Sequence, residues 1–284
     1  MIATRLMGGL GNQMFQYAAA RRLAIKHGTE LVLDLSWFER QPRSDTTRQY
    51  ELGSFPIVGR RTAEPVDGGR RKRLLRALLP EHGVRRVVEQ GPQFQPELLD
   101  APDDTLLVGY WQSEKYFLDE EAQIRRDFAF DAPISPAARA LAESIDESAV
   151  SVHVRRGDYV SLARANRFHG VLPIEYYERA AAALLQQLPE PPHFYVFSDD
   201  PKWCRTNIEL PSTTTFVSRA ESTSHEDMLL MSMCSHHIIA NSSFSWWGAW
   251  LSASPEKVVI APRRWFADES RNTSDLVPES WTRL

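Results

Sequence analysis

Short apolar strands alternate with helix-like stretches along this chain, and this alternation limits its fold more than any other feature. Eight segments have the apolar pattern of strands: residues 2–7, 30–35, 106–110, 150–154, 193–198, 214–218, 236–240 and 258–262. Helical patterns lie between them at residues 12–27, 173–188, 201–207 and 224–233. Parallel strands need a long crossover connection, which a helix supplies. We therefore predict an α/β fold with parallel sheets.

Length and composition fit one or two domains. The chain has 284 residues, and its 43% hydrophobic content is enough for sizeable cores. A domain boundary is expected between residues 129 and 148, around the turn Asp131-Ala132-Pro133. We predict a first domain of residues 1–140 and a second domain of residues 141–284.

The heptad HVRRGDY, residues 153–159, places two adjacent arginines directly after a predicted strand. Neighbouring side chains on extended backbone point to opposite faces, so one arginine can face a ligand while the other braces the loop or pairs with a carboxylate. A guanidinium group is a planar, permanently charged set of donors that matches phosphate oxygens. A diphosphate leaving group needs such fixed positive charge as its bond breaks. Taken alone, the sequence Arg-Arg-x-Asp is better explained by a salt bridge that ends a strand.

A second segment, IIANSSFSWWGAWL at residues 238–251, favours a ligand site. Asn and Ser are preferred N-cap residues, so Asn241, Ser242 or Ser243 is expected to open a helix after the strand. Backbone N–H groups and hydroxyls at a helix start bind anions without a metal. The tryptophans that follow within about one helical turn are better explained as core packing than as a sugar platform.

Glycines also lie between the first predicted strand and helix, at Gly8, Gly9 and Gly11. Glycine at such a place allows a ligand to approach the backbone closely. The spacing is not that of GxGxxG, so it gives little support for dinucleotide binding. A tight turn without a ligand explains these glycines equally well.

Two carboxylates follow another predicted strand, in the sequence FYVFSDD at residues 194–200. A carboxylate at the carboxyl end of a parallel strand can accept hydrogen bonds from guanine N–H groups or ribose hydroxyls. Alternatively, Asp200 is the N-cap of the helix that Pro201 begins, and one carboxylate can serve both purposes. Adjacent aspartates are poorly spaced for chelation, and no other metal-ligand cluster accompanies them, so we predict no metal site.

In combination, the motifs resemble the alpha-1,2-fucosyltransferase family, and in particular its bacterial members of glycosyltransferase family 11 that build O-antigens. The resemblance rests on GGLGNQMFQYA, HVRRGDY, HGVLPIEYY, FSDD, HEDMLLMSMCSHHIIANSSFSWWGAWL and PRRWF, in this order. It implies a GT-B-like fold with two Rossmann-like domains facing across a cleft. It also implies metal-independent, inverting transfer of L-fucose from GDP-β-L-fucose to the 2-hydroxyl of a terminal galactose.

The resemblance further implies a donor site built mainly from the second, GDP-fucose-binding domain, in which Arg155 would contact the diphosphate directly. The other donor-binding residues would be Arg156 at the diphosphate, His153 and either Asp199 or Asp200 at the guanosine, Ser242, Ser243 and Phe244 at the diphosphate and fucose end, and Gly11 and Asn12 from the N-terminal, acceptor-side domain.

The reaction also needs a base that takes the proton from the acceptor hydroxyl. Asp158 is the first candidate, because it shares the arginine loop. Its alternative role is that of a structural partner for Arg156. Glu175 and His169 are the other candidates.

Cysteine and charge patterns bear on the compartment. Only Cys204 and Cys234 occur, so a disulfide framework is not expected and a reducing cytoplasm fits. No apolar run approaches the roughly 18 residues of a membrane span, and the N-terminus lacks the apolar stretch of a signal peptide. Residues 60–86 hold nine Lys or Arg against three Asp or Glu. Within them, Arg70–Leu79 either rests as a basic amphipathic helix on an anionic membrane, near a lipid-linked acceptor, or packs its leucines inward.

Net charge argues against one class of function. The formal charge is −4, and the chain has no recognised nucleic-acid-binding module, so we expect no nucleic-acid partner. Two other classes stay open. One is a catalytically silent glycan-binding protein, and the other is a glycosyltransferase that uses another nucleotide sugar, such as a UDP- or dTDP-sugar.

Overall fold

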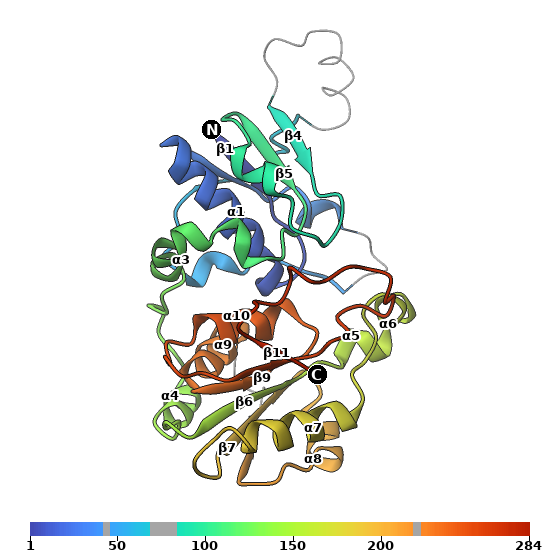
Figure 1. The fold of residues 1–284 in the computed structure, drawn as a ribbon. Helices are drawn as coiled ribbons and strands as arrows, with labels where there is room; N and C mark the ends of the chain where they lie inside the picture. Colours follow the sequence, from blue (N-terminus) through green and yellow to red (C-terminus); the bar gives the residue numbers. More distant parts are fainter. Residues whose placement is uncertain (42–45, 69–83, 218–222) are drawn as a thin grey trace. The chain divides into compact units, whose positions relative to one another are not determined.

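The computed structural model describes residues 1–41, 46–68, 84–217 and 223–284 (Figure 1). The chain forms two compact units, one of residues 1–131 with 272–278 and one of residues 132–271 with 279–284. Each unit contains its own parallel sheet, as two Rossmann-like domains require, so the predicted fold class is confirmed. The first division falls between Asp131 and Ala132, in the turn around which the boundary was expected, although the domains were divided at residues 140 and 141. The return of residues 272–278 to the first unit is not visible in the sequence.

The first unit has, within its described residues, a parallel sheet in the order β3-β2-β1-β5-β4. Its strands are β1 (Ile2–Arg5), β2 (Leu31–Asp34), β3 (Arg60–Thr62), β4 (Arg85–Val88) and β5 (Thr105–Val108). Its helices are α1 (Leu10–His27) and α3 (Glu121–Asp127), with 3-10 turns η1 (Phe38–Arg40), η2 (Leu52–Ser54), η4 (Pro96–Asp100), η5 (Glu114–Tyr116) and η6 (Leu118–Glu120). The long helix α1 ends at Gly28, whose left-handed backbone (φ 58°) suits a residue without Cβ.

The second unit has, among the residues described, a parallel sheet in the order β11-β10-β9-β6-β7-β8. Its strands are β6 (Ala149–Val154), β7 (His193–Ser198), β8 (Thr214–Phe216), β9 (His236–Ile238), β10 (Val259–Ala261) and β11 (Thr282–Arg283). Its helices are α4 (Pro136–Ala142), α5 (Gly157–Ser161), α6 (Ala163–His169), α7 (Ile174–Leu185), α8 (Pro201–Asn207), α9 (Ser224–Met233) and α10 (Ser243–Leu251).

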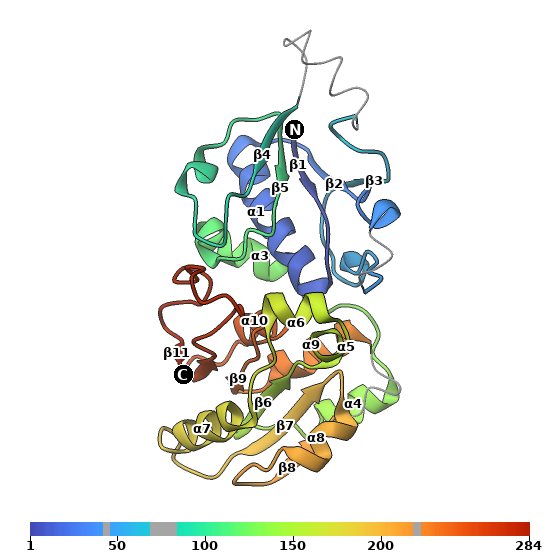
Figure 2. The ribbon, with the colours of Figure 1, turned by 90° about the vertical axis from the view of Figure 1, so that its right-hand side faces the viewer.

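Both faces of the second sheet are covered by helices (Figure 2). Alternate residues of β7 show why, because successive side chains of a strand point to opposite faces. Phe194 and Val196 pack in one core with α7 and α8 residues. Tyr195 and Phe197 pack in the other core with α4 and α9 residues. A strand buried on both faces reads as a continuous apolar run, which is how this strand appears in the sequence.

The strand order of the second sheet reverses direction at its centre. From β6 the chain proceeds to β7 and β8 on one side, and it then returns to β9, β10 and β11 on the other. The loops after β6 and β9 therefore diverge at the same sheet edge, which is where ligands bind in open parallel sheets. The first sheet has a corresponding reversal between β1 and β5.

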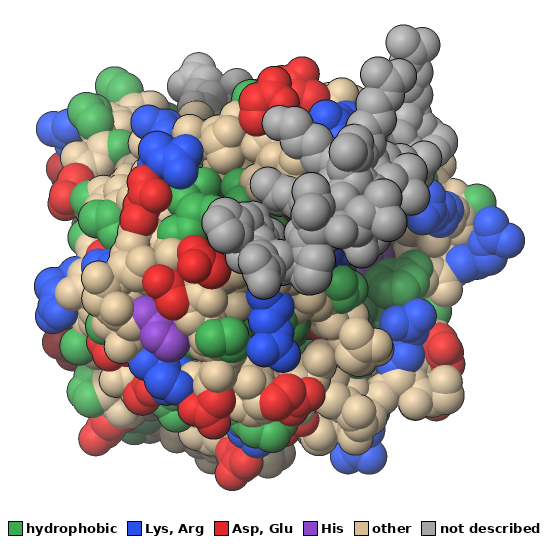
Figure 3. Space-filling view, turned by 90° about the horizontal axis from the view of Figure 1, so that it is seen from above, with side chains coloured by type: hydrophobic (Ala, Val, Ile, Leu, Met, Phe, Trp, Pro, Cys, Tyr) green, Lys and Arg blue, Asp and Glu red, His purple; other side chains and the backbone are tan. Residues whose placement is uncertain are grey.

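All eight predicted strands are present, with ends shifted by at most a few residues. Of the strands in the described ranges, β3, β4 and β11 were not predicted. Among the described residues, no helix combines the length and the apolar character needed to cross a bilayer. The predicted basic helix at Arg70–Leu79 lies outside the described residues. On the face drawn in Figure 3, the acidic and basic side chains that are described lie interspersed.

Candidate functional site

The candidate site of the second unit lies at its sheet reversal, where β6 leads into the arginine loop and β9 leads toward α10. Two contacts join these segments. The hydroxyl of Tyr159 donates to the backbone carbonyl of Asn241 at 3.3 Å, and the rings of His153 and Phe244 lie with centroids 5.6 Å apart. The topology thus brings together the predicted site residues of this unit, which follow separate strands in the sequence.

Arg155 is held between two carboxylates. Its Nη2 donates to Asp158 Oδ1 at 2.5 Å, and its Nη1 lies 2.7 Å from Asp199 Oδ2. Its guanidinium carbon also lies 5.3 Å from the centre of the Tyr159 ring. Burial by itself lowers the pKa of Arg155, but the charges of Asp199 and Asp158 outweigh burial and raise it. Arg155 is therefore a fixed, partly buried cation at the carboxyl end of β6.

Asp199 organises the arginine loop from the neighbouring strand. Its Oδ1 accepts a hydrogen bond of 2.8 Å from the Arg156 backbone N–H, and the Gly157 N–H also donates to it. Burial raises the pKa of Asp199, but Arg155 and these two N–H groups lower it more. A Cβ on Gly157 would lie 2.5 Å from Asp199 Oδ2, so a glycine is needed for this approach. Whether Asp199 also meets guanosine, as the resemblance implies, stays a prediction.

Arg156 contacts a different group of side chains. Its guanidinium carbon lies 3.5 Å from the centre of the Trp203 ring, and its Nε lies 3.4 Å from Asp200 Oδ2. Asp200 also accepts from the Trp203 N–H at 3.2 Å, as the N-cap of α8. The capping role predicted for Asp200 is confirmed. The alternative in which Asp158 braces Arg156 is wrong in its partner, because Asp158 bonds to Arg155.

The start of α10 is the second part of the site. Ser242 is its N-cap, and its Oγ accepts from the Phe244 N–H at 3.3 Å. Asn241 and Ser243 were the other two N-cap candidates. Asn241 has a different role. Its buried Nδ2 lies within hydrogen-bonding distance of three backbone carbonyls, those of His169 (3.0 Å), Gly170 (3.3 Å) and Trp265 (3.2 Å). It thereby ties the end of α6 to the N-terminal end of α10.

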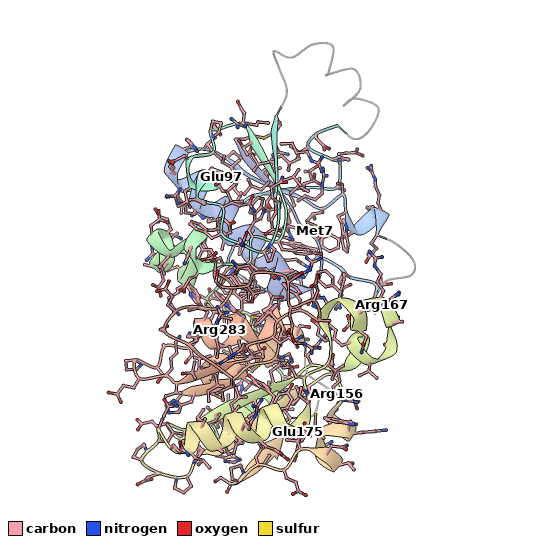
Figure 4. All side chains as sticks on the ribbon, turned by 45° about the vertical axis from the view of Figure 1, so that its right-hand side comes forward. Met7, Glu97, Arg156, Arg167, Glu175 and Arg283 are labelled. Atoms are coloured by element: carbon pink, nitrogen blue, oxygen red, sulfur yellow. The ribbon has the colours of Figure 1, made fainter. Side chains whose placement is uncertain are left out.

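The two other base candidates lie in different surroundings. His169 stacks on Tyr159, with ring centroids 4.6 Å apart and planes 3° from parallel. Burial lowers the pKa of His169 to about 4, against the opposing charge of Asp158, so its imidazole is neutral at physiological pH. Glu175 is exposed in the first turn of α7 (Figure 4).

The tryptophans of α10 are core residues, as predicted. Trp246 and Trp247 are fully buried, with ring centroids 5.1 Å apart. On the same helix, a Cβ on Gly248 would lie 3.0 Å from Met231 Cβ, so α9 and α10 pack closely at this point. These contacts fix the direction in which α10 presents its first turn.

Gly11 and Asn12 lie in the first turn of α1, in the other unit. Gly9 precedes this helix without a side-chain cap. Gly8 has a left-handed backbone (φ 77°), and a Cβ there would lie 2.6 Å from Asn12 Nδ2, so glycine is required. Asn12 Oδ1 accepts from Gln112 Nε2 at 2.7 Å. This partner was not predicted, although Gln112 comes just after the strand expected at residues 106–110.

Asp199 and Asp200 are engaged with arginines and backbone N–H groups rather than placed as a chelating pair. Over the described ranges, no group of three or more His, Cys, Asp or Glu side chains is arranged to hold a metal ion.

Comparison with known proteins gives a consistent result. A profile of the family described as glycosyl transferase family 11 matches residues 97–284. The alpha-1,2-colitosyltransferase of Escherichia coli is 33% identical over 299 residues, covering 100% of this chain and 99% of that protein. The O-antigen biosynthesis glycosyltransferase WbnK of Escherichia coli is 35% identical over 301 residues, covering 98% and 99%. The galactoside alpha-(1,2)-fucosyltransferase 1 of Homo sapiens is 30% identical over 259 residues, covering 86% of this chain and 64% of the human protein.

Proposed function

The chain belongs to glycosyl transferase family 11, and on that premise we propose that it is an inverting galactoside 2-alpha-L-fucosyltransferase. It would move L-fucose from GDP-β-L-fucose to the 2-hydroxyl of a terminal galactose, in the synthesis of an O-antigen or another surface glycan. The observation that carries the proposal is the fixed Arg155 cation at the reversal of the second sheet, where the neighbouring Tyr159 bonds the residue before the N-cap of α10. That pairing suits a diphosphate leaving group.

The contacts of Arg155 suggest how donor binding prepares the base. Asp199 is tied to the backbone of the loop, so it stays in place when a diphosphate arrives. Asp158 accepts a hydrogen bond from the Nη2 of Arg155, and a phosphate oxygen that takes this donor removes that bond from the carboxylate. Asp158 then accepts the proton of the attacking galactose 2-hydroxyl as GDP departs from the anomeric carbon on the opposite face of the fucose.

A second donor is favoured by one relative. The Escherichia coli protein that is 33% identical over the whole chain is named an alpha-1,2-colitosyltransferase. Colitose is fucose without the 3-hydroxyl, so the two donors differ by one hydrogen-bonding group. A site built to bond that hydroxyl discriminates strongly against the deoxy sugar, whereas a site with an apolar wall there discriminates weakly. Rates with GDP-fucose and GDP-colitose therefore decide which donor this enzyme uses.

The remaining parts of the proposal concern the compartment, the acceptor and the need for a metal. We place the enzyme in the cytoplasm, acting on a galactose-terminated and lipid-linked acceptor at the inner face of the membrane. No metal cofactor is needed, because arginine and a helix N-terminus supply the positive charge. Neither nucleic acid nor a disulfide enters the function.

The test measures GDP release from GDP-fucose with and without β-galactosides, beside thermal-shift screening with GDP, UDP and dTDP. A ligand that binds only the native state raises the melting temperature, and we expect GDP alone to do so. Arg155→Lys should lower transfer by roughly 10²–10³-fold, because an ammonium group lacks the planar fork. Arg179→Lys, on the exposed side of α7, is the matched control and should leave the rate unchanged. Stabilisation by UDP or dTDP instead of GDP, or GDP binding with no turnover of any GDP-sugar, would contradict the proposal.

A further inference from the structure

The turn at residues 109–112 follows β5 at the reversal of the first sheet. β1 and β5 pair in parallel, with Ile2 opposite Thr105; the chain leaves β1 for β2 on one side and arrives at β5 from β4 on the other. The loops after β1 and β5 therefore leave the same sheet edge, which is the ligand-binding edge of an open parallel sheet. The hydrogen bond from Gln112 to Asn12 shows that the two loops meet there.

Trp111 has a strained backbone within this turn. Its φ of 56° is left-handed, a conformation that a bulky residue with a Cβ adopts only when its surroundings impose it. Its ring is fully buried and lies edge-on to Tyr116, with centroids 5.6 Å apart. At Gly109, just before, a Cβ would overlap Glu89, so only glycine fits. Strain of this kind is concentrated at ligand-binding positions.

Glu89 imposes the turn from the neighbouring strand. Its Oε2 accepts from the Tyr110 N–H at 2.7 Å, and its Oε1 accepts from the Trp111 N–H at 2.8 Å. Burial raises the pKa of Glu89, although the two N–H groups lower it. The carboxylate reaches the turn because β4 and β5 pair with Val88 opposite Val108. Both oxygens of one partly buried carboxylate are thus used to fix two residues.

This arrangement fixes the position of the Tyr110 side chain. Trp111 turns inward, while Tyr110 beside it is 40% exposed. Galactose has the C–H groups of C3, C4 and C5 on one face, because its 4-hydroxyl is axial, and an aromatic ring packs well against such an apolar face. The adjacent amide of Gln112 donates one N–H to Asn12, and its second N–H and its oxygen can bond sugar hydroxyls.

We propose that the turn Gly109–Gln112 is the subsite for the terminal galactose of the acceptor. Tyr110 stacks on the apolar face of the sugar, and the Gln112 amide bonds one of its hydroxyls. Glu89 is a positioning residue, which acts by holding the turn that presents Tyr110. The inference rests on the proposed function and adds to it the place where the acceptor binds.

The first experiment uses lactose as the acceptor probe at saturating GDP-fucose, with GDP affinity measured by calorimetry. Tyr110→Ala should raise the KM for lactose by about fivefold to tenfold and leave the Kd for GDP unchanged. Tyr110→Phe keeps the ring and should restore the KM. Leu118→Ala removes a side chain of similar exposure (48%) in the same unit and should change neither constant. A lactose KM in Tyr110→Ala equal to that of Leu118→Ala, or a loosened Kd for GDP, overturns the assignment.

The second experiment tests Glu89 through Tyr110. Glu89→Gln places an amide N–H₂ against a backbone N–H, so one of the two bonds is lost. The KM for lactose should rise as in Tyr110→Ala, and the double variant should be no worse than Tyr110→Ala alone, because both changes act on the same ring. Effects that add instead show that Glu89 does not act through Tyr110. The wild type separates the two proposals: if it turns over no GDP-sugar with any galactoside, the proposed function fails, whereas normal turnover with unaltered variants overturns only the subsite.

Discussion

Asp158 and Arg155 share a hydrogen bond of 2.5 Å, so the candidate base and the candidate phosphate ligand are linked. Asp158 can therefore act either as the base or as a brace for Arg155. As a base, it must leave Arg155 when the donor binds. As a brace, it must stay, and Arg155 would then meet the diphosphate with fewer available N–H groups.

The variant Asp158→Asn separates these roles. The amide oxygen of asparagine still accepts from Arg155, so the loop keeps its shape while proton acceptance is lost. We expect transfer at saturating donor to fall by roughly two to four orders of magnitude with an almost unchanged Kd for GDP. Asp268→Asn, at an exposed aspartate 3.7 Å from Arg271, is the control and should be silent.

Loss of GDP affinity and rate in step would indicate the brace. In that outcome His169 and Glu175 become the bases to test. His169 is neutral at working pH, because burial lowers its pKa to about 4, and it stacks on the same Tyr159 ring that lies beside Arg155.

At the scale of elements, Asn241 joins three segments: the end of α6, the segment around Trp265 and the start of α10. Asn241→Ala leaves three backbone carbonyls without this donor in a buried place. We expect a loss of roughly 2–3 kcal/mol, seen as a melting temperature lower by about 5–10 °C. Asn207→Ala removes an amide that bonds only one carbonyl, four residues earlier, and should lower the melting temperature far less. Equal shifts in melting temperature for the two variants would show that the Asn241 amide contributes no more to stability than the Asn207 amide.

Elements were predictable where burial leaves a pattern in the sequence. The strand His193–Ser198 and the helices Pro201–Asn207 and Ser224–Met233 have the predicted ends, because apolar runs and capping residues mark them. The missed strand β4, Arg85–Val88, is mostly exposed and carries two arginines, so no apolar pattern marks it. The short helix α5 begins within the arginine loop, at Gly157, and α6 comes next; neither has a side-chain cap that would mark it in the sequence.

The site was predictable as a set of residues but not as a set of contacts. The types and order of the motif residues pointed to a diphosphate-sugar site. The pairing of Asp199 with Arg155 depends on β6 and β7 being neighbours with Val154 opposite Ser198, which is a property of sheet order. For the same reason, the hold of Glu89 on Tyr110 and Trp111 was not visible in the sequence.

At the scale of the whole molecule, the arrangement of charges predicts independence from divalent metals. Asp199 and Asp200 are engaged in holding Arg155, Arg156 and the start of α8, which leaves the arginines and α10 to meet the diphosphate. We expect full transfer activity in EDTA, measured as GDP release after exhaustive dialysis. Activity that is lost in EDTA and restored by Mg²⁺ or Mn²⁺ would return the aspartates to a metal-bridging role.

The path of residues 272–278 has a consequence for synthesis on the ribosome. Asp275 lies in the first unit, where its carboxylate binds Lys115 at 2.8 Å and its backbone carbonyl accepts from Ser113 at 2.6 Å. These partners are separated by 160 and 162 residues of chain. The first unit therefore emerges lacking one of its own segments, and it waits while almost all of the second unit is translated. At about 5–20 residues per second, that delay lasts on the order of ten seconds or more, during which the nascent first unit is incomplete and open to chaperones.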